Sequence, residues 1–264
     1  MGYKILVVVL ALIVILGIVF SCSQERFIFY PEKLPQDYKF LYTSPFKEYS
    51  IPVDRKTKIH GLLFQTPNPK GLVFYLHGNA GSNSTWGLLA DLYQRNQYDF
   101  FVPDYRGFGK SDGKITSEKQ FFSDVQIALD TLKQEYAGKK IVIMGFSIGS
   151  GSAAYLASKN NPSLLVLKAP YYNLPDLAKS YFRLLPKFLL RYKFRTDQYI
   201  QQVKCPVIIF HGDRDEIIYT GSSEKLKQHF KPADKLFILK GQAHNGINDN
   251  PVYQKEISVL LQNL

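Results

Sequence analysis

The sequence predicts an α/β domain built on a mostly parallel central sheet with helices on both faces. Short apolar runs alternate along the chain with longer segments in which apolar residues recur at helical spacing. The runs are apolar at nearly every position, which is typical of strands buried on both sides in a parallel sheet. Loops rich in glycine and polar residues follow several of these runs. Such sheets bind ligands beyond the carboxyl ends of their strands, so we expect the functional residues in these loops.

Length and composition fit one large α/β domain. The chain has 264 residues, of which 45% are hydrophobic, enough for a sizeable core. Its net charge of +11 is compatible with nucleic acid, a membrane surface or an anionic substrate. The sequence has no zinc-ligand spacing, no RNA-binding aromatic signature and no Lys/Arg run of the nuclear type. We therefore expect membrane lipid, and no nucleic acid, as the partner of the basic charge.

The N-terminus carries an uncharged apolar run from Ile5 to Phe20. A helix of this length spans about 24 Å, whereas a bilayer core needs roughly 20 residues. Ser21 and Cys22 follow at once, and a small residue before a cysteine resembles a bacterial lipoprotein signal. Residues 1–22 are therefore either a lipoprotein-type signal peptide or an uncleaved single-pass anchor. In the first case, which we favour, cleavage before Cys22 is followed by lipidation of its thiol on the exported side of the membrane.

An aromatic, proline-broken stretch at residues 23–48 is predicted to be an extended connector that lies on the domain. The domain itself is assigned to residues 49–264. It opens with two stretches, 49–53 and 58–65, whose pattern predicts an antiparallel hairpin. His60 lies in the second arm of this hairpin and is interpreted as a strand residue, not a catalytic one.

The remainder of the domain alternates between strands and helices. We predict strands in the apolar runs at 71–76, 100–103, 140–144, 164–167, 206–210 and 235–239. We predict helices at 84–94, 117–136, 221–230 and 252–261, and a further helix after residue 149.

Residues 171–202 interrupt this alternation and are predicted to be a cap over the site. Basic residues recur there every four positions, namely Lys179, Arg183, Lys187, Arg191 and Arg195. On a helix this spacing would form a basic ridge beside an apolar face. Pro186 breaks any single long helix, so we expect two short helices. The segment is either an apolar lid whose basic face meets lipid headgroups or a solvated insert.

The pattern Gly145-x-Ser147-x-Gly149 follows the apolar run at 140–144. A strand that turns sharply into a helix needs residues without bulky side chains on both sides of the residue at its tip. Ser147 would then project above the sheet near a helix N-terminus, which favours developing negative charge. A G-x-S-x-G pattern also occurs by chance in unrelated sequences. Here, however, it lies between a predicted strand and a run of small residues, and this position makes Ser147 the candidate nucleophile.

A serine nucleophile needs a base, an acid that orients the base, and donors for the oxyanion. Among the five histidines, His244 lies in the loop directly after the last predicted strand and is the best candidate base. The turn after the strand that ends at His211 offers Asp213 and Asp215 as the acid, and we favour Asp215. The chain order is then Ser147, Asp215 and His244.

The oxyanion donors are expected to be backbone N–H groups. One is that of Ile148, directly after the nucleophile. The other lies in the turn after His77 and Gly78, most simply at Asn79, because Gly78 allows a close approach of the chain.

Taken together, these motifs resemble those of the BEM46-like α/β-hydrolases, a group that includes the ABHD13 and ABHD17 types. The matching segments lie at 26–31, 77–81, 104–111, 145–149, 205–215 and 243–245. The resemblance implies an α/β-hydrolase fold with a small helical cap. It also implies Ser147, Asp215 and His244 as the catalytic triad, with Asn79 and Ile148 as the oxyanion hole. Members of the group include esterases, thioesterases that act on lipidated proteins, and relatives described as serine aminopeptidases.

We therefore predict a membrane-tethered serine hydrolase that cleaves carboxylic esters or thioesters through an acyl-enzyme on Ser147. No metal or cofactor is expected, and the protein is expected to be a monomer. One alternative is a serine aminopeptidase, which needs a carboxylate for the α-ammonium of its substrate, and acidic residues are few in the cap. Another is an inert scaffold that binds lipid or a partner. The cap carries Arg195 and Thr196 where many relatives have an acidic or small polar residue, so the resemblance does not extend to the substrate.

Overall fold

The computed structural model describes residues 3–4, 6–7, 15, 17, 19–183 and 185–264. Most of the apolar run predicted to be a signal peptide or membrane anchor therefore lies outside the described residues. Among the residues that are described, no helix has both the length and the apolar character needed to cross a membrane.

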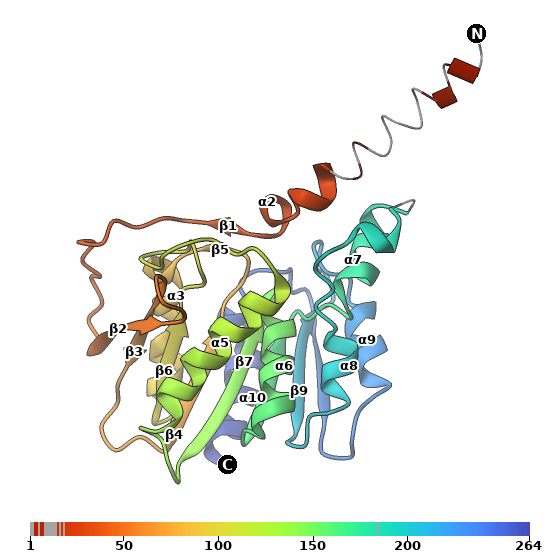
Figure 1. Ribbon diagram of the computed structural model, residues 1–264. Coiled ribbons are helices and arrows are strands. Elements are labelled where there is room, and N and C mark those ends of the chain that lie inside the picture. Colours follow the sequence, from red (N-terminus) through yellow and green to blue (C-terminus); the bar gives the residue numbers. More distant parts are fainter. Residues whose placement is uncertain (1–2, 5, 8–14, 16, 18, 184) are drawn as a thin grey trace.

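The domain is organised around an eight-stranded sheet with the strand order β10-β9-β8-β7-β4-β6-β3-β2 (Figure 1). The hairpin strands β2 and β3 are antiparallel, as is the pair β3 and β6, and all other neighbours are parallel. The strands are β2 (Phe46–Pro52), β3 (Lys58–Phe64), β4 (Gly71–Leu76), β6 (Tyr98–Pro103), β7 (Lys140–Phe146), β8 (Leu164–Lys168), β9 (Val207–Gly212) and β10 (Lys235–Leu239). The predicted mostly parallel sheet with an antiparallel hairpin at one end is confirmed.

Strand β4 shows why the apolar runs are continuous. Leu72, Phe74 and Leu76 enter the core on one face of the sheet, and Val73 and Tyr75 enter the core on the other. Successive side chains of a strand point to opposite faces, so a strand covered on both sides must be apolar throughout.

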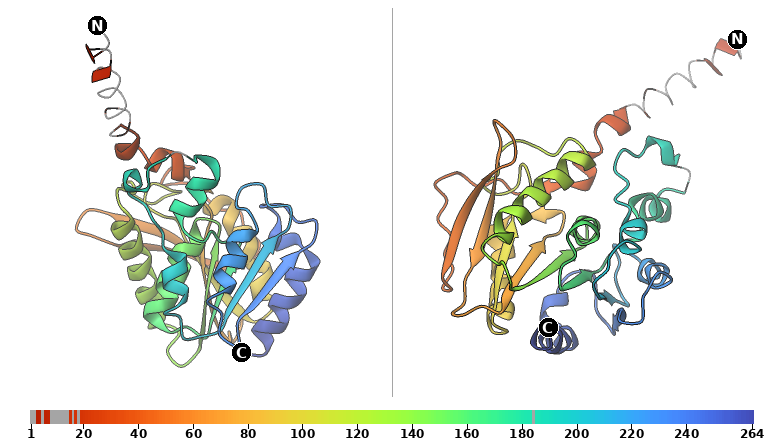
Figure 2. Two further views of the ribbon diagram at one scale, coloured as in Figure 1. Left: turned by 90° about the vertical axis from the view of Figure 1, so that its right-hand side faces the viewer. Right: turned by 60° about the horizontal axis from the view of Figure 1, so that its bottom comes forward.

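Helices cover both faces of the sheet (Figure 2). Helices α5 (Glu118–Lys133) and α6 (Gly149–Asn160) pack in one core, and α4 (Ala90–Gln94) and α10 (Pro251–Gln262) pack in the other. The predicted helix at 117–136 starts where expected, because the Ser117 side chain accepts a hydrogen bond from the Gln120 N–H and caps α5. The remaining helices are α2 (Glu25–Ile28), α3 (Asn83–Trp86), α7 (Leu174–Tyr181), α8 (Thr196–Ile200) and α9 (Gly221–Lys227), with 3₁₀ turns at Gly87–Leu89, Lys187–Leu189 and Ile247–Asp249.

The helix predicted as one piece at 84–94 is divided into α3, a 3₁₀ turn and α4. Gly87 stands at the division, where a Cβ atom would overlap the ring of Tyr42. The missing side chain lets the connector pack against this point, and glycine also weakens a helix interior.

The segment predicted to be a cap contains α7, the 3₁₀ turn at Lys187–Leu189, and α8. The expectation of a basic ridge on a helix is wrong. Pro186 is extended (φ −65°, ψ 128°), so the basic residues fall on separate elements. Arg191 pairs with Glu25 at 3.3 Å, and Arg195 pairs with Asp197 at 3.1 Å. These two ion pairs hold Arg191 and Arg195 in place. The two residues lie outside α7 and therefore form no helical row with Lys179.

The connector crosses the carboxyl-terminal edge of the sheet (Figure 1). It contains the short helix α2 and the strand β1 (Tyr30–Pro31), which pairs in parallel with β5 (Ala80–Gly81). It is therefore less extended than predicted, and it lies directly against the loop that follows β4.

Candidate active site

Ser147 occupies the turn between β7 and α6. Its backbone has φ +53°, a left-handed conformation that is strained for a residue with a side chain. A Cβ atom on Gly149 would overlap the Leu76 carbonyl oxygen, and one on Gly145 would overlap the Gly149 carbonyl oxygen. The two glycines therefore permit the sharp turn, and Ser147 is held at its tip.

The structure brings Ser147, His244 and Asp215 into one hydrogen-bonded line. His244 Nε2 lies 3.0 Å from Ser147 Oγ, and His244 Nδ1 lies 2.7 Å from Asp215 Oδ2. A carboxylate only accepts hydrogen bonds, so Nδ1 of His244 donates to it and Nε2 accepts from the Ser147 hydroxyl. This arrangement makes His244 able to remove the Ser147 proton.

The Asp215 side chain is fully buried. Burial alone would raise the pKa of its carboxyl, but hydrogen bonds from His211, His244 and the Ile218 amide outweigh burial and hold that pKa below its usual range. The group is therefore an ionised acceptor at neutral pH. Asp213, the other aspartate considered for this role, is exposed and accepts the Gly241 N–H at 2.6 Å instead.

His211 supports Asp215, a role that the sequence did not reveal. Its Nε2 lies 2.8 Å from the Ile218 carbonyl oxygen and 3.2 Å from Asp215 Oδ2, and its Nδ1 lies 2.6 Å from Ser223 Oγ. Both Nε2 partners are acceptors, so Nε2 carries the proton and Nδ1 accepts from the Ser223 hydroxyl. The four-residue spacing of His211 and Asp215 across the turn after β9 was the available signal.

Asn79 and Ile148 are the residues predicted to supply the oxyanion donors. Both residues line the same cavity as Ser147, and within the described part of the chain neither N–H donates a hydrogen bond. His77 Nδ1 donates to the Gly78 carbonyl oxygen at 2.7 Å. In a trans peptide the carbonyl and the N–H point in opposite directions, so the Asn79 N–H is turned away from His77. Burial lowers the pKa of His77 to about 3, which keeps this ring neutral.

An apolar cavity of about 460 Å³ opens above Ser147. It is walled by the connector, the cap segment and the loop after β9. Its lining consists of Phe20, Gln24, Phe27, Ile28, Asn79, Ser147, Ile148, Tyr171, Leu174, Leu177, Ala178, Tyr181, Phe182, Leu185, Leu190, Tyr192, Ile217 and Ile218. No Asp, Glu, Lys or Arg occurs among these described lining residues, so the cavity suits an apolar group.

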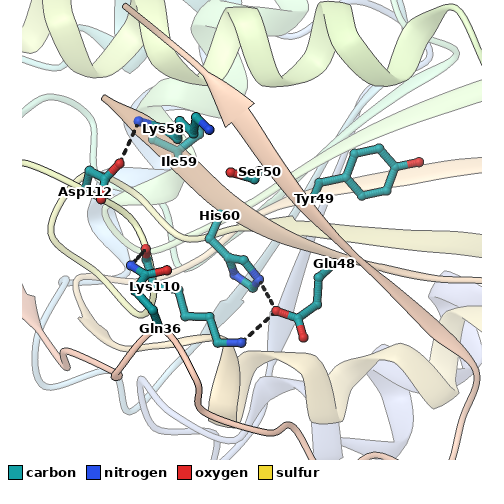
Figure 3. A pocket seen from close by; sticks show the side chains of 9 residues that line it. All are labelled: Gln36, Glu48, Tyr49, Ser50, Lys58, Ile59, His60, Lys110 and Asp112. Atoms are coloured by element: carbon teal, nitrogen blue, oxygen red, sulfur yellow. Dashed lines mark hydrogen bonds and ion pairs between the residues drawn. The ribbon is translucent and has the colours of Figure 1, made fainter. Parts of the chain in front are cut away.

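His60 lies in β3, as predicted, and faces a separate polar hollow of about 310 Å³. Figure 3 shows its ring turned toward Glu48, whose Oε2 accepts from both His60 Nε2 and Lys110 Nζ at 2.8 Å. Neither His244 nor Ser147 lines this hollow.

The two cysteines are free thiols. Cys22, the candidate for lipidation, is exposed, whereas Cys205 is buried, and burial raises its pKa to about 11. In the described ranges, no group of three His, Cys, Asp or Glu side chains is arranged to hold a metal ion.

Residues 67–198, about half of the chain, match the family described as serine aminopeptidase, S33. The chain belongs to the α/β-hydrolases. The matched range contains Asn79 and Ser147 and ends before Asp215 and His244, so the geometry alone joins the last two to the site.

Known relatives of this α/β-hydrolase include a lysophosphatidylserine lipase of Danio rerio, 30% identical over 188 residues, or 62% of this chain and 47% of the relative. They also include the human α/β hydrolase domain-containing protein 17B, 28% identical over 194 residues, or 69% and 63% of the two chains. The chain thus spans about half the length of the lipase.

Solved structures show the same fold. An esterase of Pyrococcus furiosus superposes with a TM-score of 0.69 at 19% identity, covering 89% of this chain and 97% of its own. Est1E of Butyrivibrio proteoclasticus, solved with ferulic acid bound, gives a TM-score of 0.66 at 19% identity, covering 81% of this chain and 96% of its own. The predicted α/β-hydrolase fold and the predicted membership of the α/β-hydrolases are confirmed.

Proposed function

We propose that the protein hydrolyses carboxylic esters or thioesters through an acyl-enzyme on Ser147. The observation that carries this proposal is the line of hydrogen bonds from Asp215 through His244 to Ser147, whose side chain lines the apolar cavity.

In the first half-reaction, His244 Nε2 takes the hydroxyl proton as Ser147 Oγ attacks the acyl carbonyl carbon. The carbonyl oxygen becomes an oxyanion and accepts hydrogen bonds from the Asn79 and Ile148 N–H groups. The tetrahedral intermediate collapses, and His244 passes its proton to the departing alcohol or thiol. Asp215 holds the imidazole in the required tautomer and stabilises its cation.

In the second half-reaction, water takes the place of the alcohol or thiol. His244 Nε2 removes a proton from the water molecule, whose oxygen attacks the acyl carbon. Collapse of this intermediate returns the proton to Ser147 Oγ and releases the carboxylic acid. No step needs a group from outside the chain other than water.

The cavity favours an apolar acyl group as substrate. Its described lining has no carboxylate to hold an α-ammonium group, so the aminopeptidase alternative has no support beyond the description of the matched family. An inert scaffold is also disfavoured, because the strained turn at Ser147 and the complete partner set of Asp215 would serve no purpose in it. The lipase among the relatives points to the same substrate class.

The proposal includes attachment to a membrane by the N-terminus, either through lipid on Cys22 or through the apolar run before it. The exposed thiol of Cys22 and the net charge of +11 support this location. Mass spectrometry of the mature N-terminus distinguishes the two forms, because lipidation requires Cys22 to be the first residue.

The test is turnover of p-nitrophenyl esters and the matching thioesters in a chain-length series, with wild type and Ser147→Ala. We expect Ser147→Ala to lose about 10⁴-fold or more in kcat, and a fluorophosphonate probe to label Ser147 only. Unchanged hydrolysis by Ser147→Ala, or labelling of a different residue by the probe, would contradict the proposal.

A further inference from the structure

The connector is paired to the loop that carries Asn79. The Tyr30 N–H donates to the Asn79 carbonyl oxygen at 2.7 Å, and the Glu32 N–H donates to the Gly81 carbonyl oxygen at 3.1 Å. These bonds form the parallel pair β1 and β5. They join residues about fifty positions apart in the sequence, directly beside the proposed oxyanion hole.

The Glu32 side chain strengthens this attachment. Its Oε2 accepts from Ser82 Oγ at 2.5 Å and from Ser84 Oγ at 3.0 Å. Ser82 is fully buried, and its Oγ also accepts the Ser84 N–H at 3.2 Å to cap α3. A single carboxylate therefore holds the part of the loop that follows Asn79.

The same connector is fastened to the cap. Gln24 is only 2% exposed, and its side-chain amide donates to the Leu189 carbonyl oxygen at 2.5 Å and accepts the Arg191 N–H at 2.9 Å. Glu25 accepts the Tyr192 hydroxyl at 2.8 Å. Between these two attachments, Phe27 and Ile28 of the connector line the cavity.

Two peptide groups flank Asn79, and different parts of the chain hold them. His77 fixes the carbonyl of the preceding group, and Tyr30 fixes the carbonyl of the following group. The Asn79 N–H belongs to the preceding group, so the bond from His77 sets its direction, because that peptide is planar. The bond from Tyr30 holds the following group, so Asn79 is fixed on both sides and its backbone cannot rotate away. Stabilisation of an oxyanion depends on a donor that is already aimed before the reaction begins.

We propose that residues 24–32 of the connector are a positioning element of the active site, which fixes Asn79, and with it the direction of the Asn79 N–H, through backbone pairing with the loop at 79–81. The inference rests on the proposed function. It means that the segment leading to the apolar N-terminus controls the rate of turnover as well as the location of the domain.

The test compares Tyr30→Pro with Tyr30→Ala in the full chain. Proline removes the N–H, and the preceding Phe29 (φ −122°, ψ 128°) already has the extended conformation that a following proline requires. Alanine removes the side chain and keeps the N–H. We expect kcat to be about 10-fold lower in Tyr30→Pro than in Tyr30→Ala, with KM within about twofold.

A second pair separates positioning from folding. Glu32→Ala removes the acceptor for Ser82 and Ser84, whereas Glu32→Gln keeps a carbonyl oxygen at that place. We expect Glu32→Ala to lower kcat about threefold or more and Glu32→Gln to restore most of it, at equal melting temperatures. This pair decides the question if Tyr30→Pro does not fold.

Equal kcat within each pair would overturn the positioning role, and so would a change in KM alone, since that result would make the connector only a wall of the cavity. Ser147→Ala separates this failure from failure of the proposed function. If Ser147→Ala is inactive while both pairs have equal kcat, only the positioning role is lost.

Discussion

Asp215 Oδ2 lies 2.7 Å from His244 Nδ1 and 3.2 Å from His211 Nε2, so one carboxylate oxygen is shared by two histidines. The other oxygen, Oδ1, accepts the amides of Ile217 and Ile218 at 2.9 and 2.8 Å. Besides His244 itself, three donors thus hold the carboxylate against which His244 is placed. The orientation of His244 therefore depends on His211 and on the loop after β9 as well as on Asp215.

We predict that His211→Ala lowers kcat about 10- to 100-fold with little change in KM, because Asp215 loses a donor and no longer holds His244 at the same angle. Ser223→Ala is the matched control. It removes only the hydroxyl that donates to His211 Nδ1, and we expect a smaller effect. Steady-state kinetics on one p-nitrophenyl ester measures both. Turnover by His211→Ala within twofold of wild type would contradict the role.

We expect the Asp215 carboxyl to make the free energy of unfolding depend on pH in the acidic range. Burial raises its pKa, but hydrogen bonds from His211, His244 and the Ile218 amide bring it below the ordinary 3.8. A carboxyl whose pKa falls on folding stabilises the protein above its unfolded pKa, and this stabilisation is lost as pH falls toward the folded pKa. We expect the free energy of unfolding of wild type to fall more steeply between about pH 4 and pH 2 than that of Asp215→Asn.

Denaturant unfolding at a series of pH values measures this difference. Burial lowers the pKa of His77 to about 3, so His77 also reduces stability as pH falls below its unfolded pKa of 6.5. That effect is present in both proteins, and the difference between their slopes therefore isolates Asp215. Parallel curves for the two proteins below pH 4 would count against the lowered pKa.

The backbone at Ser147 gives a prediction about stability. A residue with a Cβ atom is strained at φ +53°, and glycine is not. We expect Ser147→Gly to be about 1 kcal/mol more stable than Ser147→Ala, the reverse of the usual order, which corresponds to roughly 2–4 °C in melting temperature. Both variants lack the hydroxyl, so calorimetry compares them without a difference in activity. An alanine variant as stable as the glycine variant would show that the turn relaxes.

The cavity above Ser147 predicts a dependence on acyl length. Leu177 lines it, and Leu177→Trp would fill part of its volume. We expect kcat/KM for long-chain p-nitrophenyl esters to fall about 10-fold or more, and that for the acetate to stay within about twofold. Leu88→Trp, at an exposed position outside the cavity, is the control. An equal loss for all chain lengths would place the acyl group elsewhere.

Much of the fold could be predicted from the sequence because a strand that is buried on both sides is apolar at successive positions. Strand β4 is apolar at every position from Leu72 to Leu76, and Gly145 and Gly149 mark the sharp turn that holds Ser147. The order of Ser147, Asp215 and His244 was likewise readable from loops that follow strands.

The remainder depends on contacts that have no local pattern. The pairing of Tyr30 with Asn79 uses backbone atoms, which every residue has, so no residue type signals it. The basic ridge was wrong for a related reason: the spacing of Arg191 and Arg195 is helical, but their ion pairs and Pro186 decide the conformation. Tertiary contacts overrode periodicity there.

The buried side chain of Gln24 has a consequence for how the enzyme would meet its substrate. Gln24 lies two positions after Cys22, so a lipid on that thiol would have at most about 7 Å of slack from a point fixed to the cap. Such a tether is too short for the domain to swing away from the bilayer. The enzyme would then search for substrate by lateral diffusion in two dimensions, and the released fatty acid would return to the leaflet from which the ester came.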